Sequence, residues 1–175
     1  MKKVLIAGGA GFIGTLLTKE LLARKYEVLV VDTLWFGNYL PENAKISNKS
    51  IIDLKEDELS SFDVVIYLGG VSNDPMADYS PSVNFIENCA VPCYLSYMCK
   101  RAGVPRFVYA SSCSVYGYAA NSLMDENSPV SPSYPYGISK LAIENAVMNM
   151  ADKNFRPIAL RKGTVGGYSP RMRFD

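Results

Sequence analysis

The amino-acid sequence predicts an α/β fold in which a doubly wound parallel sheet, in the strand order 3-2-1-4-5-6, carries helices on both faces. Short apolar runs alternate with helical patterns along the chain of 175 residues, and glycine or proline residues separate them. Such alternation is typical of right-handed β-α-β units, whose strands all run in one direction. In addition, Gly8, Gly11 and Gly14 directly follow the first apolar run and lead into a helical pattern. A strand, a glycine turn and a helix in this order place phosphate groups at the amino end of the helix.

The first half of the chain is expected to contain four strands and two helices. Apolar runs predict strands at Val4–Ala7, Glu27–Asp32 and Asp63–Leu68, with a weaker strand at about Lys45–Ile51. Leu16, Leu17, Leu21 and Leu22 predict a helix from Phe12 to about Arg24, and an acidic stretch predicts a short helix from Lys55 to Leu59. The segment 34–43 is rich in turn residues.

The second half is expected to contain two long helices and two strands. Residues 72–81 (SNDPMADYSP) are interpreted as a loop, and a helical pattern follows from about Pro81 to Arg101. Pro92 lies inside that pattern and predicts a kink or a break. Strands are predicted at Arg106–Ser111 and Arg156–Leu160, separated by a loop from Ser112 to Pro132 and a helix from Tyr134 or Pro135 to about Lys153.

Composition narrows the classes of function. Apolar residues make up 49% and charged residues 20% of the chain, and the net charge of +1 gives no support to nucleic-acid binding. No apolar run approaches the ~20 residues of a membrane span. Glycines interrupt the apolar run after Lys2 and Lys3 too early for a signal peptide, so we expect a cytoplasmic protein without a membrane partner.

The chain has four cysteines and no histidine, which excludes Ser-His-Asp and Cys-His hydrolases. We expect the cysteines to be buried, reduced thiols and expect no metal. A weaker alternative stays open, in which Cys89 and Cys93 share a helix face as a metal or redox pair.

A cofactor site is predicted at the carboxyl ends of the first strands. The three glycines allow a tight turn, close approach to phosphate and close helix–strand packing, although a plain tight turn is the alternative. Asp32 ends the second predicted strand, where a carboxylate can bind adenosine ribose hydroxyls or simply cap the strand. Because no Arg or Lys lies between Thr33 and Asn43, NAD is favoured over NADP.

Two further positions extend this interpretation. Asp53, predicted to end the third strand, could meet the adenine amino group or be a solvated turn residue. Gly69 and Gly70, after the fourth strand, could let the backbone lie against the cofactor or form a simple turn.

A catalytic pair is predicted at the start of the last long helix. Tyr136 and Lys140 are four residues apart and therefore project from one face. A lysine ammonium near a phenol favours the phenolate and lowers its pKa from about 10, which makes tyrosine a usable acid and base. Ser111 and Ser112 close the fifth predicted strand at the same edge of the sheet, where a hydroxyl could hold a substrate oxygen.

Together, GGAGFIG, Asp32 with LWFG behind it, SSCSVYG and YPYGISK resemble the extended short-chain dehydrogenase/reductase family, and within it the NAD-dependent nucleotide-sugar epimerase/dehydratase branch. The resemblance implies a Rossmann domain over residues 1–165 and the start of a truncated substrate-binding region over 166–175. It implies Ser112, Tyr136 and Lys140 as catalytic residues. The residues it assigns to NAD binding are Gly8, Gly11, Phe12, Ile13, Gly14, Asp32, Asp53, Leu54, Leu68, Gly69, Gly70, Tyr136 and Lys140.

The resemblance further implies a nucleotide-diphosphate sugar as substrate and oxidation of one sugar hydroxyl to a keto intermediate, which is then reduced again. Dehydratases of the branch carry Asp-Glu after the catalytic Ser or Thr, whereas Cys113 and Ser114 follow Ser112 here, which favours an epimerase. A keto-sugar reductase or dehydrogenase, a 4,6-dehydratase-like enzyme and a non-catalytic NAD-binding module remain alternatives. The family also implies a homodimer that packs through the helix at 81–101 and the Tyr136 helix. Arg171 and Arg173 could face a substrate diphosphate or be solvated loop charges.

Overall fold

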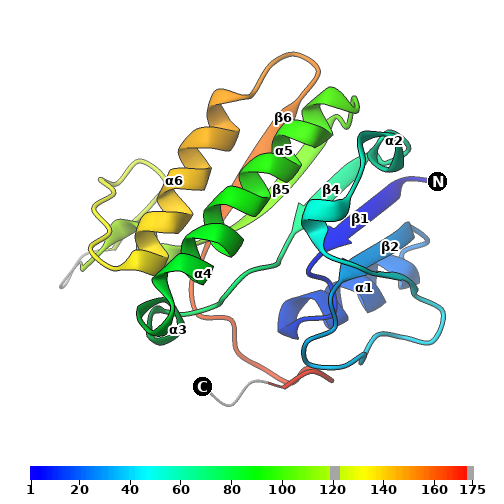
Figure 1. Cartoon of the computed structure of the whole chain (residues 1–175), viewed down its shortest axis with the longest axis horizontal. Helices are drawn as coiled ribbons and strands as arrows, with labels where there is room; N and C mark the ends of the chain where they lie inside the picture. Colours follow the sequence, from blue (N-terminus) through cyan, green and yellow to red (C-terminus); the bar gives the residue numbers. More distant parts are fainter. Residues whose placement is uncertain (119–122, 173–175) are drawn as a thin grey trace.

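Six parallel strands form the centre of the computed structural model, which describes residues 1–118 and 123–172 (Figure 1). The strands lie in the order β3-β2-β1-β4-β5-β6, and each hydrogen-bonded pair is parallel. They are β1 (Lys3–Ala7), β2 (Glu27–Asp32), β3 (Lys45–Asn48), β4 (Val64–Tyr67), β5 (Arg106–Ser112) and β6 (Arg156–Lys162). The predicted fold class and strand order are confirmed. Strand order reverses between β1 and β4, and ligands of such sheets bind in the crevice at that point.

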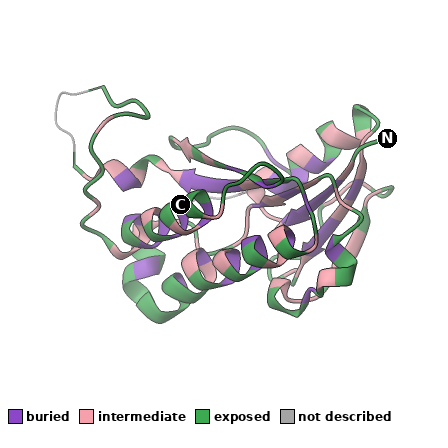
Figure 2. Ribbon diagram, turned by 90° about the horizontal axis from the view of Figure 1, so that it is seen from above, coloured by how far each residue is buried: buried purple, intermediate pink, exposed green. Residues whose placement is uncertain are grey.

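Helices cover both faces of the sheet because side chains alternate along each strand. On one face, Val4 and Ile6 of β1 belong to a cluster with Leu17, Leu21 and Leu22 of α1 (Phe12–Ala23). On the other face, Leu5 and Ala7 belong to a larger cluster that includes Leu59 of α2 (Glu56–Leu59), Leu95 of α5 (Val91–Arg101) and Ile143 of α6 (Pro135–Asn149). Figure 2 shows buried residues concentrated in the strands and exposed residues on the outer sides of the helices.

The chain between β4 and β5 is helical almost throughout, so the loop predicted for residues 72–81 is wrong. It contains α3 (Asp74–Tyr79), α4 (Pro81–Phe85), the π-helix η2 (Ile86–Ala90) and α5. The Asn73 side chain caps α3 by accepting a hydrogen bond from the Met76 backbone N–H at 2.9 Å, and a proline occupies the first turn. Asn, Asp and Pro favour turns and helix starts alike, and the sequence interpretation chose the turn.

The irregularity predicted at Pro92 as a kink or a break takes the form of the π turn η2 just before it, and the helix runs on from Pro81 to Arg101 without interruption. Pro92 has no N–H to donate to the carbonyl four residues earlier, which belongs to Asn88. That carbonyl instead accepts a hydrogen bond from the Tyr109 hydroxyl at 3.0 Å, and the Glu87 carbonyl accepts one from the Tyr67 hydroxyl at 2.6 Å. The irregular turn is thereby pinned to the middle of the sheet.

Four predicted boundaries are corrected. Strand β3 ends at Asn48, so Asp53 ends the 3-10 helix η1 (Ile51–Asp53) and not a strand. The predicted loop after β5 begins with a 3-10 helix, η3 (Cys113–Tyr116). Helix α6 ends at Asn149, and Asp152 accepts hydrogen bonds from the N–H groups of Asn154 and Phe155 at 2.8 and 2.9 Å, which closes a turn before β6. Strand β6 continues two residues beyond Leu160, to Lys162.

The cysteines are free, but their burial differs from the expectation. Cys99 is fully buried, whereas Cys89 and Cys93 are partly buried against the core and Cys113 is exposed. Within residues 1–118 and 123–172, no group of three His, Cys, Asp or Glu side chains is placed to hold a metal ion. No helix in the same part of the chain is long and apolar enough to cross a membrane.

Candidate functional site

A glycine-lined cradle lies at the carboxyl end of β1, beside the loop that follows β4. Gly8 has φ +77, and a Cβ there would lie 2.4 Å from the Gly69 backbone nitrogen. A Cβ on Gly14 would lie 2.4 Å from the Gly9 carbonyl oxygen, so α1 begins directly against the turn. Gly11 is the N-cap of α1, and Phe12 and Ile13 form its first turn. The backbone N–H groups of a first turn have no intrahelical partner, and α1 has no acidic residue there, so this end suits an anion.

Asp32 holds the cradle in place from the end of β2. Its Oδ2 accepts a hydrogen bond from the Ala10 backbone N–H at 3.0 Å, and its Oδ1 accepts one from the Leu34 N–H at 2.8 Å. Each carboxylate oxygen retains acceptor capacity for a further donor. The carboxylate therefore organises the glycine turn and can still receive hydroxyl groups of a ribose.

The other predicted cofactor residues surround this cradle at the same edge of the sheet. Leu68 continues β4 by donating its N–H to the Ala7 carbonyl at 2.8 Å. Gly70 has φ +105, and a Cβ there would lie 2.1 Å from Oδ1 of Asn88. Asp53 is exposed at the end of η1, whereas the Leu54 side chain is buried in the core, so only its backbone could meet an adenine.

Lys140 is the most unusual ionisable group of the site because it is only 4% exposed. Its Nζ donates to the Ala110 carbonyl at 3.1 Å and lies 4.9 Å from the ring centroid of Tyr109 and 5.4 Å from that of Tyr136. Burial, and to a smaller extent the charge of Lys162, lower the pKa of Lys140 to about 7. The spacing of Tyr136 and Lys140 thus brings them together on one face of α6, as predicted.

Ser112 lies at the junction between β5 and η3. Its Oγ caps η3 by accepting the Ser114 backbone N–H at 3.1 Å and is hydrogen-bonded to the Ser114 hydroxyl at 3.1 Å. The first turn of α6 packs directly on this segment, since a Cβ on Gly137 would lie 2.6 Å from the Ser114 carbonyl oxygen. Gly137 follows Tyr136, so the backbone bearing the tyrosine lies next to the serine turn.

Sequence reasoning missed a buried amide pair beneath the site. Asn84 and Asn88 are fully buried and joined by a hydrogen bond of 2.8 Å. Asn84 also donates to the Pro135 carbonyl at 3.0 Å, and Asn88 donates to the Val71 carbonyl at 2.9 Å. The pair thereby fixes the start of α6 and the loop after β4. Two asparagines one helical turn apart on a core-facing side would have been the clue in the sequence.

Sequence reasoning also missed a buried carboxylate, Glu144, and its arginine partner, Arg161. Glu144 is one helical turn beyond Lys140, so a second charged residue on the core-facing side of α6 was visible in the sequence. Its partner on β6 was not predictable from spacing.

The segment after β6 returns across the carboxyl edge of the sheet to the glycine turn. Ser169 is fully buried and donates its hydroxyl to the Phe12 carbonyl at 2.8 Å. The Arg171 guanidinium lies 3.9 Å from the ring centroid of Phe36 and donates to the Met172 carbonyl at 3.1 Å. Arg171 therefore lies beside the loop after β2. It brings a cation to this loop, which itself contains no Arg or Lys. Arg173 lies outside the described residues.

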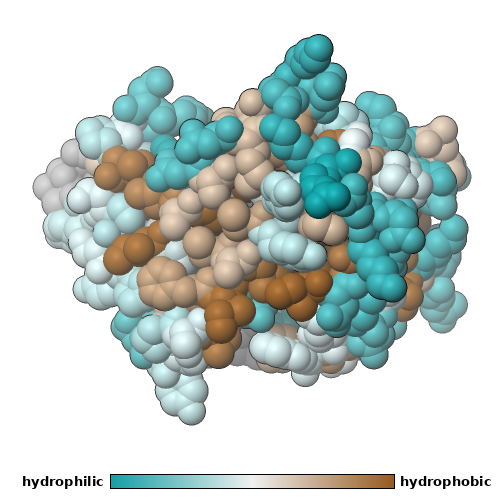
Figure 3. All heavy atoms as spheres, turned by 45° about the horizontal axis from the view of Figure 1, so that its top comes forward, coloured by the Kyte–Doolittle hydropathy of each residue, from teal (hydrophilic) through white to brown (hydrophobic). Residues whose placement is uncertain are grey.

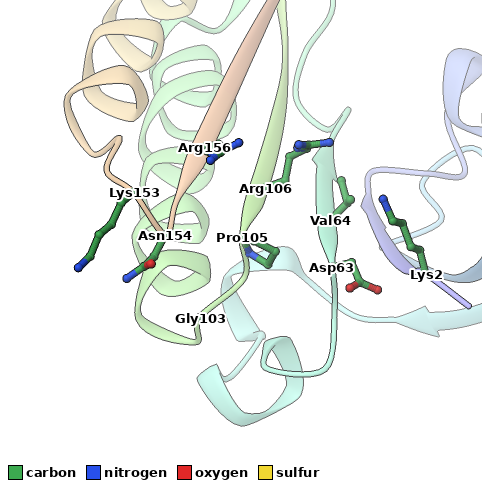
Figure 4. A pocket seen from close by; sticks show the side chains of 9 residues that line it. All are labelled: Lys2, Asp63, Val64, Gly103, Pro105, Arg106, Lys153, Asn154 and Arg156. Atoms are coloured by element: carbon green, nitrogen blue, oxygen red, sulfur yellow. The ribbon is translucent and has the colours of Figure 1, made fainter.

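The geometry fits a dinucleotide, which the cradle would hold by backbone and carboxylate. The crowded glycine contacts leave a surface of backbone only, the amino end of α1 faces it, and the Asp32 carboxylate lies beside it at the end of β2. A separate cavity of about 640 Å³ opens at the opposite edge, where β4, β5 and β6 begin (Figure 4). Lys2, Asp63, Arg106 and Arg156 are among its lining residues, and none of the predicted site residues lies there.

Comparison with known proteins agrees with this site. The model of the NAD-dependent epimerase/dehydratase family matches residues 4–175. UDP-glucose 4-epimerase of Lactobacillus helveticus is 30% identical over 178 residues, covering 95% of this chain and 53% of the relative. The structure of the UDP-Glc/GlcNAc 4-epimerase from Campylobacter jejuni has a TM-score of 0.82 at 26% identity, covering 92% of this chain and 53% of that one.

A second kind of neighbour is an NAD-dependent NDP-hexosamine 5,6-dehydratase of tunicamycin biosynthesis, with a TM-score of 0.81 at 33% identity and coverage of 91% of this chain and 53% of that one. The chain spans about half the length of these relatives. NAD is the cofactor of the matching family, as the glycine turn and Asp32 predicted. On the family match and the site geometry together, the chain belongs to the NAD-dependent epimerase/dehydratase family.

Proposed function

We propose that this chain is the NAD-binding and acid/base half of a nucleotide-sugar 4-epimerase. The observation that carries the proposal is that Tyr136 and Lys140 lie together on α6, whose first turn packs through Gly137 on the Ser112 turn. The similarity to UDP-glucose 4-epimerases supports a UDP-sugar as the substrate. We assign residues 1–165 to the cofactor domain and 166–175 to the start of the substrate-binding region.

NAD is bound by the residues that line the cradle. The backbone of Gly8, Gly11, Phe12, Ile13 and Gly14, at the amino end of α1, would hold its pyrophosphate. Asp32 accepts the adenosine ribose hydroxyls, and the adenine lies beside Asp53 and the Leu54 backbone. The backbone of Leu68, Gly69 and Gly70 borders the cofactor between the two halves of the sheet, and Tyr136 and Lys140 meet its nicotinamide ribose.

Tyr136 is the acid and base of the reaction. The phenolate form, which the adjacent Lys140 favours when its amine is protonated, takes the proton from a sugar hydroxyl, and the phenol returns it in the reverse direction. The Ser112 hydroxyl holds the same sugar oxygen by a hydrogen bond. Bound NAD supplies the acceptor, and then the donor, of the hydride at the sugar carbon.

A dehydratase is the second candidate, because an NDP-hexosamine 5,6-dehydratase is 33% identical to this chain. Elimination of water needs an additional acid or base near the sugar. Cys113 and Ser114 stand directly after Ser112 and supply no carboxylate, which favours epimerisation.

A keto-sugar reductase would be recognised by net NADH formation, whereas an epimerase regenerates NAD in every turnover. A non-catalytic module would bind NAD but no nucleotide sugar.

Two further properties are part of the proposal. Apolar side chains gather on the side of the molecule seen in Figure 3, and exposed ones on η2, α5 and α6 support a homodimer that packs through these helices. They are Ile86, Tyr94, Tyr97, Ile138 and Met148. On the same helices, Leu95, Ile143 and Val147 belong to the core instead. Four free cysteines support a reducing compartment, the cytoplasm.

The test has two stages. Calorimetric titration of the 175-residue chain with NAD should show binding that Asp32→Ala weakens. The chain is then joined to the second half of the Lactobacillus helveticus enzyme and incubated with NAD and UDP-, GDP- or CDP-sugars, and products are identified by NMR. We expect interconversion of 4-epimers that Tyr136→Phe abolishes. Absence of NAD binding, or equal turnover by the Tyr136→Phe protein, would refute the proposal.

A further inference from the structure

A buried ion pair ties the end of β5 to α6 and β6. The Glu144 side chain is 6% exposed, and its Oε2 accepts hydrogen bonds from Nε and Nη2 of Arg161 at 3.1 and 2.9 Å. Oε1 accepts a hydrogen bond from the Ser111 hydroxyl. Arg161 uses its remaining nitrogen, Nη1, to donate to the Tyr116 hydroxyl at 3.3 Å and the Glu126 carbonyl at 3.4 Å.

The network holds both ends of the turn that contains Ser112. Ser111 precedes that turn and is bonded to Glu144, and Tyr116 ends η3 and is bonded to Arg161. The Arg161 guanidinium carbon also lies 5.1 Å from the ring centroid of Tyr116. The backbone between the two anchored points carries the Ser112 hydroxyl.

The same network fixes the position of α6 along β5. Lys140 and Glu144 lie on successive turns of α6 and bind successive residues of the strand, the Ala110 carbonyl and the Ser111 hydroxyl. Sliding or rotating α6 would break both contacts. Tyr136 lies one turn before Lys140, so its place relative to Ser112 depends on this pair of contacts.

Stability alone gives little reason for such a pair. Taking the charged carboxylate of Glu144 out of water is unfavourable, and apolar pairs of similar volume are often as stable as an ion pair or more stable. A bidentate arginine–carboxylate contact instead fixes the relative orientation of the two side chains, because the planar guanidinium and the carboxylate fit together in one geometry.

We propose that Glu144 and Arg161 are positioning residues that hold the Ser112 turn and the Tyr136 end of α6 in one fixed arrangement for the reaction. The benefit to catalysis rests on the proposed function. The positioning itself does not, because it concerns contacts within the chain.

The test compares three forms of the 175-residue chain: the wild type, Ser111→Ala and the double variant Glu144→Leu/Arg161→Met. The double variant replaces the pair with apolar side chains, so the core stays filled. Ser111→Ala removes one hydroxyl and leaves the ion pair intact. Hydrogen exchange measures the protection of the Ser114 N–H, which is hydrogen-bonded to Ser112 Oγ. The protection of the Ile6 N–H in the central strand β1 serves as the reference for global stability.

We expect protection of the Ser114 N–H to fall roughly three- to tenfold relative to Ile6 in both variants, the effect of weakening one hydrogen bond. In the NAD complex, ¹³Cζ NMR of tyrosine should show the pKa of Tyr136 rising toward its ordinary value of about 10 in both variants. Wild-type protection of Ser114 in a folded double variant would overturn the positioning role. If the double variant does not fold, Ser111→Ala decides in the same way. A wild-type chain that binds no NAD, or whose Tyr136 titrates near 10 with NAD bound, contradicts the proposed function, while the Ser114 result still decides the positioning.

Discussion

Replacing Gly8 with alanine should damage both folding and cofactor binding, and the chain contains a matched control for the backbone part of the effect. Gly8 and Gly103 have almost the same positive φ, +77 and +78. A Cβ on Gly8 would lie 2.4 and 2.5 Å from backbone atoms of Gly69, whereas nothing lies within 4 Å of a Cβ on Gly103. The two substitutions therefore share the conformational cost and differ in the steric cost.

The magnitude follows from these two costs. A left-handed alanine costs roughly 1–2 kcal/mol, and the lower entropy of the unfolded alanine chain acts equally on both variants. Overpacking against a backbone that must shift adds about 1–3 kcal/mol. We expect Gly103→Ala to lose about 1 kcal/mol and Gly8→Ala about 2–4 kcal/mol of unfolding free energy. For a chain of this size, each 1 kcal/mol corresponds to roughly 2–4 °C in Tm.

Urea unfolding measures the stabilities, and calorimetric titration measures NAD affinity. We expect Gly8→Ala to lose most of its NAD affinity at concentrations where it remains folded, while Gly103→Ala binds like the wild type. Equal destabilisation by the two substitutions would refute the steric argument. Unchanged NAD affinity in Gly8→Ala would show that the cradle is not the cofactor site.

Three other substitutions test separate parts of the structure. Lys140 has a folded pKa of about 7, below its ordinary value near 10.4, so it adds stability as pH increases from about 7 to 10. Burial raises the pKa of the Cys99 thiol, which acts in the opposite direction above about pH 8.5, so urea unfolding should show the Lys140 contribution as a growing difference between the wild type and Lys140→Met. Tyr67→Phe leaves the buried Glu87 carbonyl without its 2.6 Å hydrogen bond and should cost about 1–3 kcal/mol in thermal unfolding, whereas the exposed Tyr79→Phe should cost almost nothing. Asp32→Asn turns an amide donor toward one of two backbone N–H groups, so NAD affinity should fall at least about tenfold by calorimetry; an unchanged affinity would remove Asp32 from the site.

The strands were predictable because each is an apolar run with a defined end. Glu27–Asp32 was predicted to the residue, since Asp32 stops the run at the sheet edge. Asp53 was placed on a strand because the apolar Ile51 and Ile52 extend the pattern beyond β3, whereas hydrogen bonds from Asp53 and Leu54 N–H to nearby carbonyls close a 3-10 turn there. Periodicity cannot separate these two outcomes in so short a segment.

The candidate site was predictable where its members are close in sequence. Tyr136 and Lys140 are one helical turn apart, and Gly8, Gly11 and Gly14 belong to one turn, so spacing alone placed them. Glu144 has its partners 33 residues before and 17 residues after it, and their meeting depends on how β5, α6 and β6 pack. Arg171 approaches Phe36 in the same way, through the return of the chain to the first half of the sheet.

The π turn changes how the helical surface between Pro81 and Arg101 must be interpreted. It holds about one residue more than an α turn, and one residue corresponds to about 100° around a helix. The buried side of the helix nevertheless runs on through this turn, because Asn84, Asn88 and Leu95 are all buried, whereas Tyr94, the neighbour of Leu95, is 41% exposed. Deleting one residue within Ile86–Ala90 would restore a regular helix and swing the tyrosines of α5 out of the surface they now occupy.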